Sequence, residues 1–141
     1  MKILVPVDGS PFTKRMLGYL AAHDEWLGGA HDYTILHSVP SVPSRAAAVI
    51  EREQLKKYYE DEAEKVFKPI RAFFARKTDL KVVYVAKTGQ AADSIASLAA
   101  KGGYHMIIMG SHGHGTLSNL VMGSVATKVL ANCKTPVLLV R

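Results

Sequence analysis

Short apolar runs alternate along this chain with longer segments whose apolar residues recur at three- and four-residue steps. Continuous apolar or β-branched runs are typical of strands covered on both faces, as in a parallel sheet. Such runs predict strands at Lys2 to Val7, Tyr33 to Val39, Lys81 to Ala86, His105 to Met109 and Val137 to Val140. The alternation predicts one α/β domain over residues 1–141, a doubly wound five-stranded parallel sheet with helices on both faces.

The first helix is expected to open at Ser10 and Pro11, an N-cap and first-turn pair, and to close at Gly28 and Gly29. Its buried face would contain Met16, Leu17, Leu20, Ala21 and Leu27. A helix from about Gln90 to Ala100 would bury Ala91, Ile95, Leu98 and Ala99. This pattern indicates residues that pack in the core and have no chemical role.

The longest helix is expected in the middle of the chain. Its apolar positions are Leu55, Tyr59, Ala63, Val66, Ile70 and Phe73. Pro69 predicts a kink or a fresh start, because a proline inside a helix removes a hydrogen bond and clashes with the preceding turn.

Glycines between the fourth strand and the last helix carry the clearest chemical signal. Gly110-Ser111-His112-Gly113 follows an apolar strand, and Gly123-Ser124 precedes the segment Val125 to Leu130, which reads as helix. Glycine permits positive φ and close approach of a ligand, so these positions can aim N–H groups at phosphate oxygens. Ser124 would add a hydroxyl at the helix start. An ordinary loop with turn glycines is the alternative.

The segment from Gly102 to Thr127 contains no Asp, Glu, Lys or Arg, so backbone groups would hold a phosphate there. The helix dipole contributes at most ~2 kcal/mol, whereas micromolar binding needs roughly 8 kcal/mol. Several charge-assisted hydrogen bonds of ~1.5–3 kcal/mol each, together with burial of a base, would supply the difference.

With Asp8 at the end of the first strand, the pattern Gly110-x2-Gly113-x9-Gly123-Ser124 resembles the nucleotide signature of the universal stress protein family, in its ATP-binding branch. The likeness covers the whole chain and includes the opening segment Ile3 to Ser10 and the closing segment Thr135 to Val140. The resemblance implies an adenine-nucleotide alpha-hydrolase-like fold with the strand order 3-2-1-4-5.

The resemblance also implies a set of binding residues. Pro6, Val7 and Asp8 would line the nucleoside, with Asp8 reaching the ribose or a Mg²⁺ ion on the phosphates. Ser38 would offer its backbone to adenine, Met109 and Gly110 would flank base and ribose, and Gly113, Gly123, Ser124 and Val125 would hold phosphate. For Asp8, a plain turn role before Gly9 is the alternative.

The motifs favour a binding module over an enzyme. The chain has no Gly-Lys-Ser/Thr phosphate loop, no Gly-x-Ser-x-Gly elbow and no dinucleotide fingerprint in its first turn. We therefore expect an ATP-binding stress-response or regulatory module with slow or no hydrolysis, and assign no catalytic residue. The alternatives are an ATPase or nucleotidyl-transfer enzyme of related fold, and an adaptor that binds AMP or another adenylate.

The net charge of +6 raises the possibility of nucleic-acid binding, but its distribution disfavours it. Between Arg45 and Lys81, ten basic and seven acidic residues are interleaved, as on a solvated helix face. His112 and His114 supply two metal ligands at most and are expected beside the phosphate. No apolar run is long enough to span a membrane and no signal peptide is recognised, so cytoplasm is the expected location. Cys133 is the only cysteine.

The last predicted strand favours a homodimer. Val137, Leu138, Leu139 and Val140 would form a sheet edge with no proline or charge inside it. Such an edge is a template for pairing, and two copies can pair across a two-fold axis. The family resemblance points the same way, and an edge covered by a helix or loop is the alternative.

Overall fold

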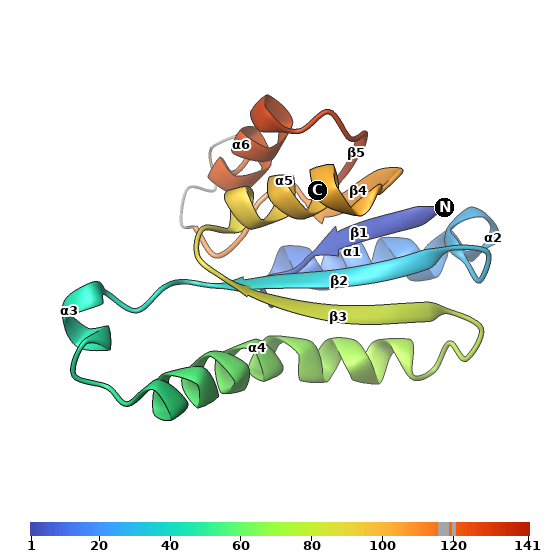
Figure 1. The fold of residues 1–141 in the computed structure, drawn as a ribbon. Helices are drawn as coiled ribbons and strands as arrows, with labels where there is room; N and C mark the ends of the chain where they lie inside the picture. Colours follow the sequence, from blue (N-terminus) through green and yellow to red (C-terminus); the bar gives the residue numbers. More distant parts are fainter. Residues whose placement is uncertain (116–118, 120) are drawn as a thin grey trace.

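The computed structural model describes residues 1–115, 119 and 121–141, and its centre is a parallel five-stranded sheet (Figure 1). The strands are β1 (Lys2–Pro6), β2 (Asp32–Val39), β3 (Lys81–Thr88), β4 (Met106–Gly110) and β5 (Val137–Val140). Their order is β3-β2-β1-β4-β5, which confirms the α/β fold and the predicted strand order. The order reverses between β1 and β4, and in open α/β sheets a ligand crevice lies at the carboxyl ends of the strands at such a point.

Helices cover both faces of the sheet. They are α1 (Pro11–Ala22), α2 (Asp24–Leu27), α3 (Ser44–Ala47), α4 (Arg52–Phe74), α5 (Ala91–Gly102) and α6 (Ser124–Asn132). One core packs α1, α2 and α4 against side chains such as Ile3 and Val5, and the other packs α5 and α6 against Leu4 and Ile107. Figure 1 shows α4 below the sheet and α5 above it. Alternate residues of β1 therefore serve opposite cores, as the pleat requires.

The first predicted helix is two helices. It ends at Ala22, and His23 adopts a non-helical backbone (φ −120°, ψ 42°) before α2 begins. The His23 N–H donates to the Tyr19 carbonyl at 3.2 Å, and its ring stacks on the Tyr19 ring at 4.1 Å. The helix ends six residues before Gly28. Ala21, within α1, is exposed instead of buried. Ser10 is the N-cap residue as predicted, but its side chain makes no capping hydrogen bond.

A single helix, α4, spans Pro69, where a kink or a fresh start was predicted, so no new helix begins there. Pro69 and Lys65, whose carbonyl loses its helical donor, are both exposed, so water can replace the missing hydrogen bond. The most buried positions of α4 are Ala63, Phe67, Ile70 and Phe74. Val66 and Phe73, which the pattern placed on the buried face, are only half-buried.

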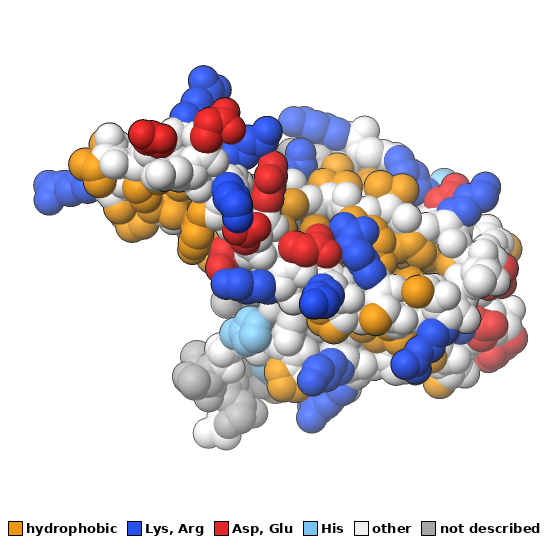
Figure 2. All heavy atoms as spheres, turned by 90° about the horizontal axis from the view of Figure 1, so that it is seen from below, with side chains coloured by type: hydrophobic (Ala, Val, Ile, Leu, Met, Phe, Trp, Pro, Cys, Tyr) orange, Lys and Arg blue, Asp and Glu red, His pale blue; other side chains and the backbone are white. Residues whose placement is uncertain are grey.

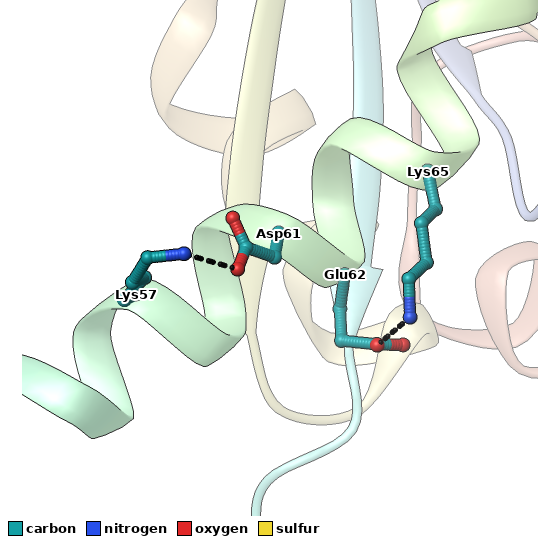
Figure 3. A network of polar contacts seen from close by, with 4 residues as sticks. All are labelled: Lys57, Asp61, Glu62 and Lys65. Atoms are coloured by element: carbon teal, nitrogen blue, oxygen red, sulfur yellow. Dashed lines mark hydrogen bonds and ion pairs between the residues drawn. The ribbon is translucent and has the colours of Figure 1, made fainter.

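Charged side chains of α4 pair with one another along the helix. Lys57 Nζ lies 3.0 Å from Asp61 Oδ2, and Lys65 Nζ lies 2.5 Å from Glu62 Oε1 (Figure 3). Figure 2 shows Lys and Arg interspersed with Asp and Glu on the face seen from below. Exposed pairs of this kind contribute little to stability. They break up the positive charge of this part of the chain.

The last strand, β5, pairs with β4 on one side, with Ile108 opposite Leu138 in the register. Among the described residues, no helix combines the length and the apolar character needed to cross a membrane.

Candidate functional site

A cavity of about 220 Å³ opens beside the carboxyl ends of β1 and β4, where the strand order reverses. A bound water needs only about 10–15 Å³ by this kind of measure, so the cavity has room for a small organic molecule. It is lined by Pro6, Val7, Asp8, Thr13, Ala91, Ile95, Met109, Gly110, Ser111, His112, Gly113, His114, Gly115, Gly123, Ser124, Val125 and Ala126.

The cavity brings together every predicted site residue except Ser38. The residues that line it are Pro6, Val7, Asp8, Met109, Gly110, Gly113, Gly123, Ser124 and Val125. Ser38 lies near the end of β2 and does not line the cavity. Its hydroxyl donates to the Gly89 carbonyl at 3.1 Å and lies 2.9 Å from Ser94 Oγ. Ser38 therefore ties the end of β2 to the start of α5.

The three motif glycines are needed for space and not for an unusual backbone. Positive φ occurs among the described residues at Gly9, Gly89 and Gly103, and none of the three motif glycines has it. A Cβ on Gly110 would lie 2.8 Å from Phe12 Cβ, and one on Gly113 would overlap Asp8 Oδ2. A Cβ on Gly123 would lie 3.1 Å from both His112 Cα and the Ser111 carbonyl oxygen.

Asp8 is held by several hydrogen bonds at the start of α1. Its Oδ1 accepts hydrogen bonds from the Ser10 N–H at 2.9 Å and from the Thr13 hydroxyl at 3.0 Å. Its own N–H donates to Thr13 Oγ1 at 3.2 Å, and its carbonyl oxygen lies 2.6 Å from His114 Nε2. The hydrogen bonds of the turn at the start of α1 therefore use Oδ1 of Asp8. Its Oδ2 lies against Gly113 and receives no hydrogen bond from the described residues.

The first turn of α6 presents N–H groups to the cavity. The first helical hydrogen bond runs from the Thr127 N–H to the Gly123 carbonyl at 3.0 Å. The N–H groups of Ser124, Val125 and Ala126 consequently have no acceptor within the helix, and all three residues line the cavity. The Gly123 N–H already donates to the Ser111 carbonyl at 2.7 Å. Gly123 therefore contributes space, and the three residues after it contribute donors.

The charge of the lining is negative. Asp8 is the one Asp, Glu, Lys or Arg among the residues that line the cavity in the described part of the chain. The described residues contain no cluster of three or more His, Cys, Asp or Glu side chains that could hold a metal ion. The Asp8 carboxylate is a suitable oxygen ligand for Mg²⁺, but the remaining ligands would have to come from a bound phosphate and water.

Sequence reasoning missed part of the lining. Ala91 and Ile95 were expected to be core residues alone, yet both also line the cavity. Their spacing of four residues places them on one face of α5, and the start of this helix lies at the carboxyl edge of the sheet. Thr13, in the first turn of α1, was missed because its hydroxyl faces a residue that precedes the helix.

Comparison with known proteins gives consistent matches over the whole chain. The model of the universal stress protein family matches residues 1–141. A universal stress protein in the QAH/OAS sulfhydrylase 3' region of Thermus aquaticus is 30% identical over 139 residues, covering 99% of this chain and 97% of that protein. The solved structure of hypothetical protein MJ0577 has 28% identity and a TM-score of 0.80, covering 99% of this chain and 94% of that one.

A more distant structure carries a ligand. The universal stress protein from Archaeoglobus fulgidus in complex with dAMP has 19% identity and a TM-score of 0.67. The match covers 100% of this chain and 98% of that one. At this identity the likeness shows a shared fold.

Proposed function

We propose that this chain, which belongs to the universal stress protein family, binds an adenine nucleotide in the cavity beside β1 and β4. The nucleotide is ATP with Mg²⁺. The observation that carries this proposal is the convergence of separate segments on one cavity. The end of β1, the end of β4 and the start of α6 supply its walls. These are the segments for which the family resemblance implies nucleoside and phosphate contacts.

The two sides of the cavity suit the two ends of a nucleotide. Val7, Ile95 and Met109 supply apolar surface for a base. The N–H groups at the start of α6 are donors for phosphate oxygens, and their partial positive charge favours an anion. Asp8 Oδ2 is the acceptor for a ribose hydroxyl or a ligand for Mg²⁺. Ser38 would act through its main chain, since its hydroxyl is engaged with α5.

The negative lining supports a binding module with slow or no hydrolysis. Phosphoryl transfer is catalysed by positioned cations and by a group that orients the nucleophile. No Lys or Arg lines the cavity in the described part of the chain. ATP occupancy would therefore act as a signal, in a stress-response or regulatory role. A cytoplasmic location remains a prediction.

A monophosphate is the second candidate ligand, and the dAMP complex of the relative from Archaeoglobus fulgidus favours it. ATP and a monophosphate differ in the number of phosphate oxygens available to α6. Relative affinity therefore distinguishes an ATP-binding module from an adenylate-binding adaptor.

We also propose a homodimer formed through β5. Val137, Leu138 and Leu139 are half-buried in the single chain, and β5 pairs with one neighbouring strand. Pairing two copies of β5 would use the free edge and cover these side chains.

Two measurements test the nucleotide proposal. Mass spectrometry of the purified protein, after denaturation, identifies any nucleotide that it carries. Calorimetric titration with ATP and AMP, each with and without Mg²⁺, then compares affinities, with GTP as the control for base recognition. We expect micromolar binding of ATP in the presence of Mg²⁺. Binding of neither ATP nor AMP would overturn the proposal.

A further inference from the structure

Thr13 is a buried residue of α1 whose hydroxyl group bonds to Asp8 twice. Its side chain is 6% exposed and lines the cavity. Thr13 Oγ1 accepts a hydrogen bond from the Asp8 N–H at 3.2 Å and donates one to Asp8 Oδ1 at 3.0 Å. One hydroxyl group thus links the backbone and the carboxylate of the same residue.

These bonds determine which carboxylate oxygen faces the cavity. Asp8 Oδ1 has two donors, the Thr13 hydroxyl and the Ser10 N–H at 2.9 Å. With Oδ1 anchored at two points, Oδ2 is directed toward Gly113. Loss of the Thr13 hydroxyl would leave the Ser10 N–H as the one donor to Oδ1 among the described residues and would free the carboxylate to rotate. Hydrogen bonds to charged groups are the stronger class, so this anchor is substantial.

We propose that Thr13 is a positioning residue for nucleotide binding, which fixes the Asp8 carboxylate so that Oδ2 meets the ribose or the nucleotide's metal ion. This inference rests on the proposed nucleotide function. Thr13 acts through Asp8, so its hydroxyl matters only while the carboxylate is present. A purely structural role would instead lower the stability of α1 and leave the affinity of the folded protein unchanged.

Three variants of the full chain test the role by titration with ATP and Mg²⁺. Thr13→Val removes the hydroxyl at nearly constant shape and should weaken binding about five- to tenfold. Thr13→Ser keeps the hydroxyl and should bind within about twofold of the unaltered protein. Thr34→Val makes the same change at a buried threonine of β2 outside the cavity lining and should leave affinity unchanged. Thr13→Ala replaces the valine variant if circular dichroism shows that the latter is unfolded.

A double-mutant cycle with Asp8→Ala separates an indirect role from a direct one. If Thr13 acts through Asp8, adding Thr13→Val to Asp8→Ala should cause no further loss of affinity. A further fivefold loss would show that Thr13 acts other than through the Asp8 carboxylate and would overturn the proposal. Equal affinities of Thr13→Val and the unaltered protein would also overturn it, with nucleotide binding itself intact. Absence of ATP and AMP binding by the unaltered protein would overturn both proposals.

Discussion

The carboxylate of Asp8 occupies the space that a side chain at Gly113 would need. A Cβ built on Gly113 would overlap Oδ2 of Asp8, so a larger residue at this position would disturb that contact, whereas its φ angle sets no restriction. The contact joins the end of β1 to the loop after β4, and it places the one acidic side chain of the described lining against the glycine motif.

Gly113→Ala should therefore weaken binding of ATP with Mg²⁺ by about tenfold, or ~1.4 kcal/mol, because the methyl group displaces Oδ2 or the loop. Calorimetric titration measures this change. Gly18→Ala is the matched control, since nothing lies within 4 Å of a Cβ at that exposed helical position. It should leave affinity unchanged and stabilise α1 by roughly 0.5–1 kcal/mol. Full affinity in Gly113→Ala would contradict the role given to this contact.

Gly123→Val should abolish ATP binding in a protein that still folds. The branched side chain would press on His112 Cα and the Ser111 carbonyl oxygen, each 3.1 Å from its Cβ, and would crowd the path to the α6 N–H groups. Titration of the variant, after circular dichroism has established its helix content, decides the matter. Unchanged affinity would show that the phosphate does not bind at the start of α6.

Asp8→Ala should weaken binding of ATP with Mg²⁺ by ~1–3 kcal/mol through loss of a charge-assisted contact. Asp8→Asn separates the two roles of the residue. Its side-chain oxygen can still accept the Ser10 and Thr13 hydrogen bonds, whereas the negative charge is lost. We expect Asp8→Asn to fold like the unaltered protein and to bind more weakly when Mg²⁺ is present. Full affinity in both variants would return Asp8 to a turn role alone.

Leu139→Lys should shift the protein from dimer toward monomer, because it would place like charges near the two-fold axis of the proposed β5 pairing. Light scattering at micromolar concentration measures the molar mass. Val83→Lys makes a comparable change on β3, the opposite edge strand, where Val83 is 60% exposed, and should leave the mass unchanged. A monomeric unaltered protein, or a dimeric Leu139→Lys variant, would exclude this interface.

Stability should fall in strongly alkaline solution because of Tyr33. Burial, with the nearby charge of Asp24, raises the pKa of Tyr33 from 10.0 to about 12, and its hydroxyl donates to the Leu27 carbonyl. Between pH 10 and 12 the unfolded chain loses this proton while the folded protein keeps it. The free energy of unfolding should therefore fall over that range by roughly 1–3 kcal/mol.

Urea denaturation at pH 9, 10, 11 and 12 measures this loss. Burial also raises the pKa of Tyr84, so the unaltered protein should be compared with Tyr33→Phe. The contribution of Tyr33 is the part of the pH dependence that disappears in the variant. Identical pH dependence in both proteins would show that Tyr33 ionises alike in the folded and unfolded states.

The sequence by itself determined the five strands, but not the break between α1 and α2, and it identified most of the cavity lining. Apolar runs such as Met106 to Met109 identify strands because successive side chains point to opposite faces, so a strand covered on both faces is apolar throughout. The carboxyl ends of parallel strands meet at one edge, so Asp8 and Gly110 could be placed together before any contact was known. The family signature then added the residues around Gly123 and Ser124.

Only the tertiary structure decided how these residues share their hydrogen bonds and space. Asp8 and His114 are more than one hundred positions apart, and their contact depends on how β1 and β4 pair. The Gly123 N–H donates to the Ser111 carbonyl, and Ser38 bonds to α5 outside the cavity. These partners too depend on how separate segments pack. Periodicity says which face a residue takes, but a donor's partner is set by packing between segments that are distant in the sequence.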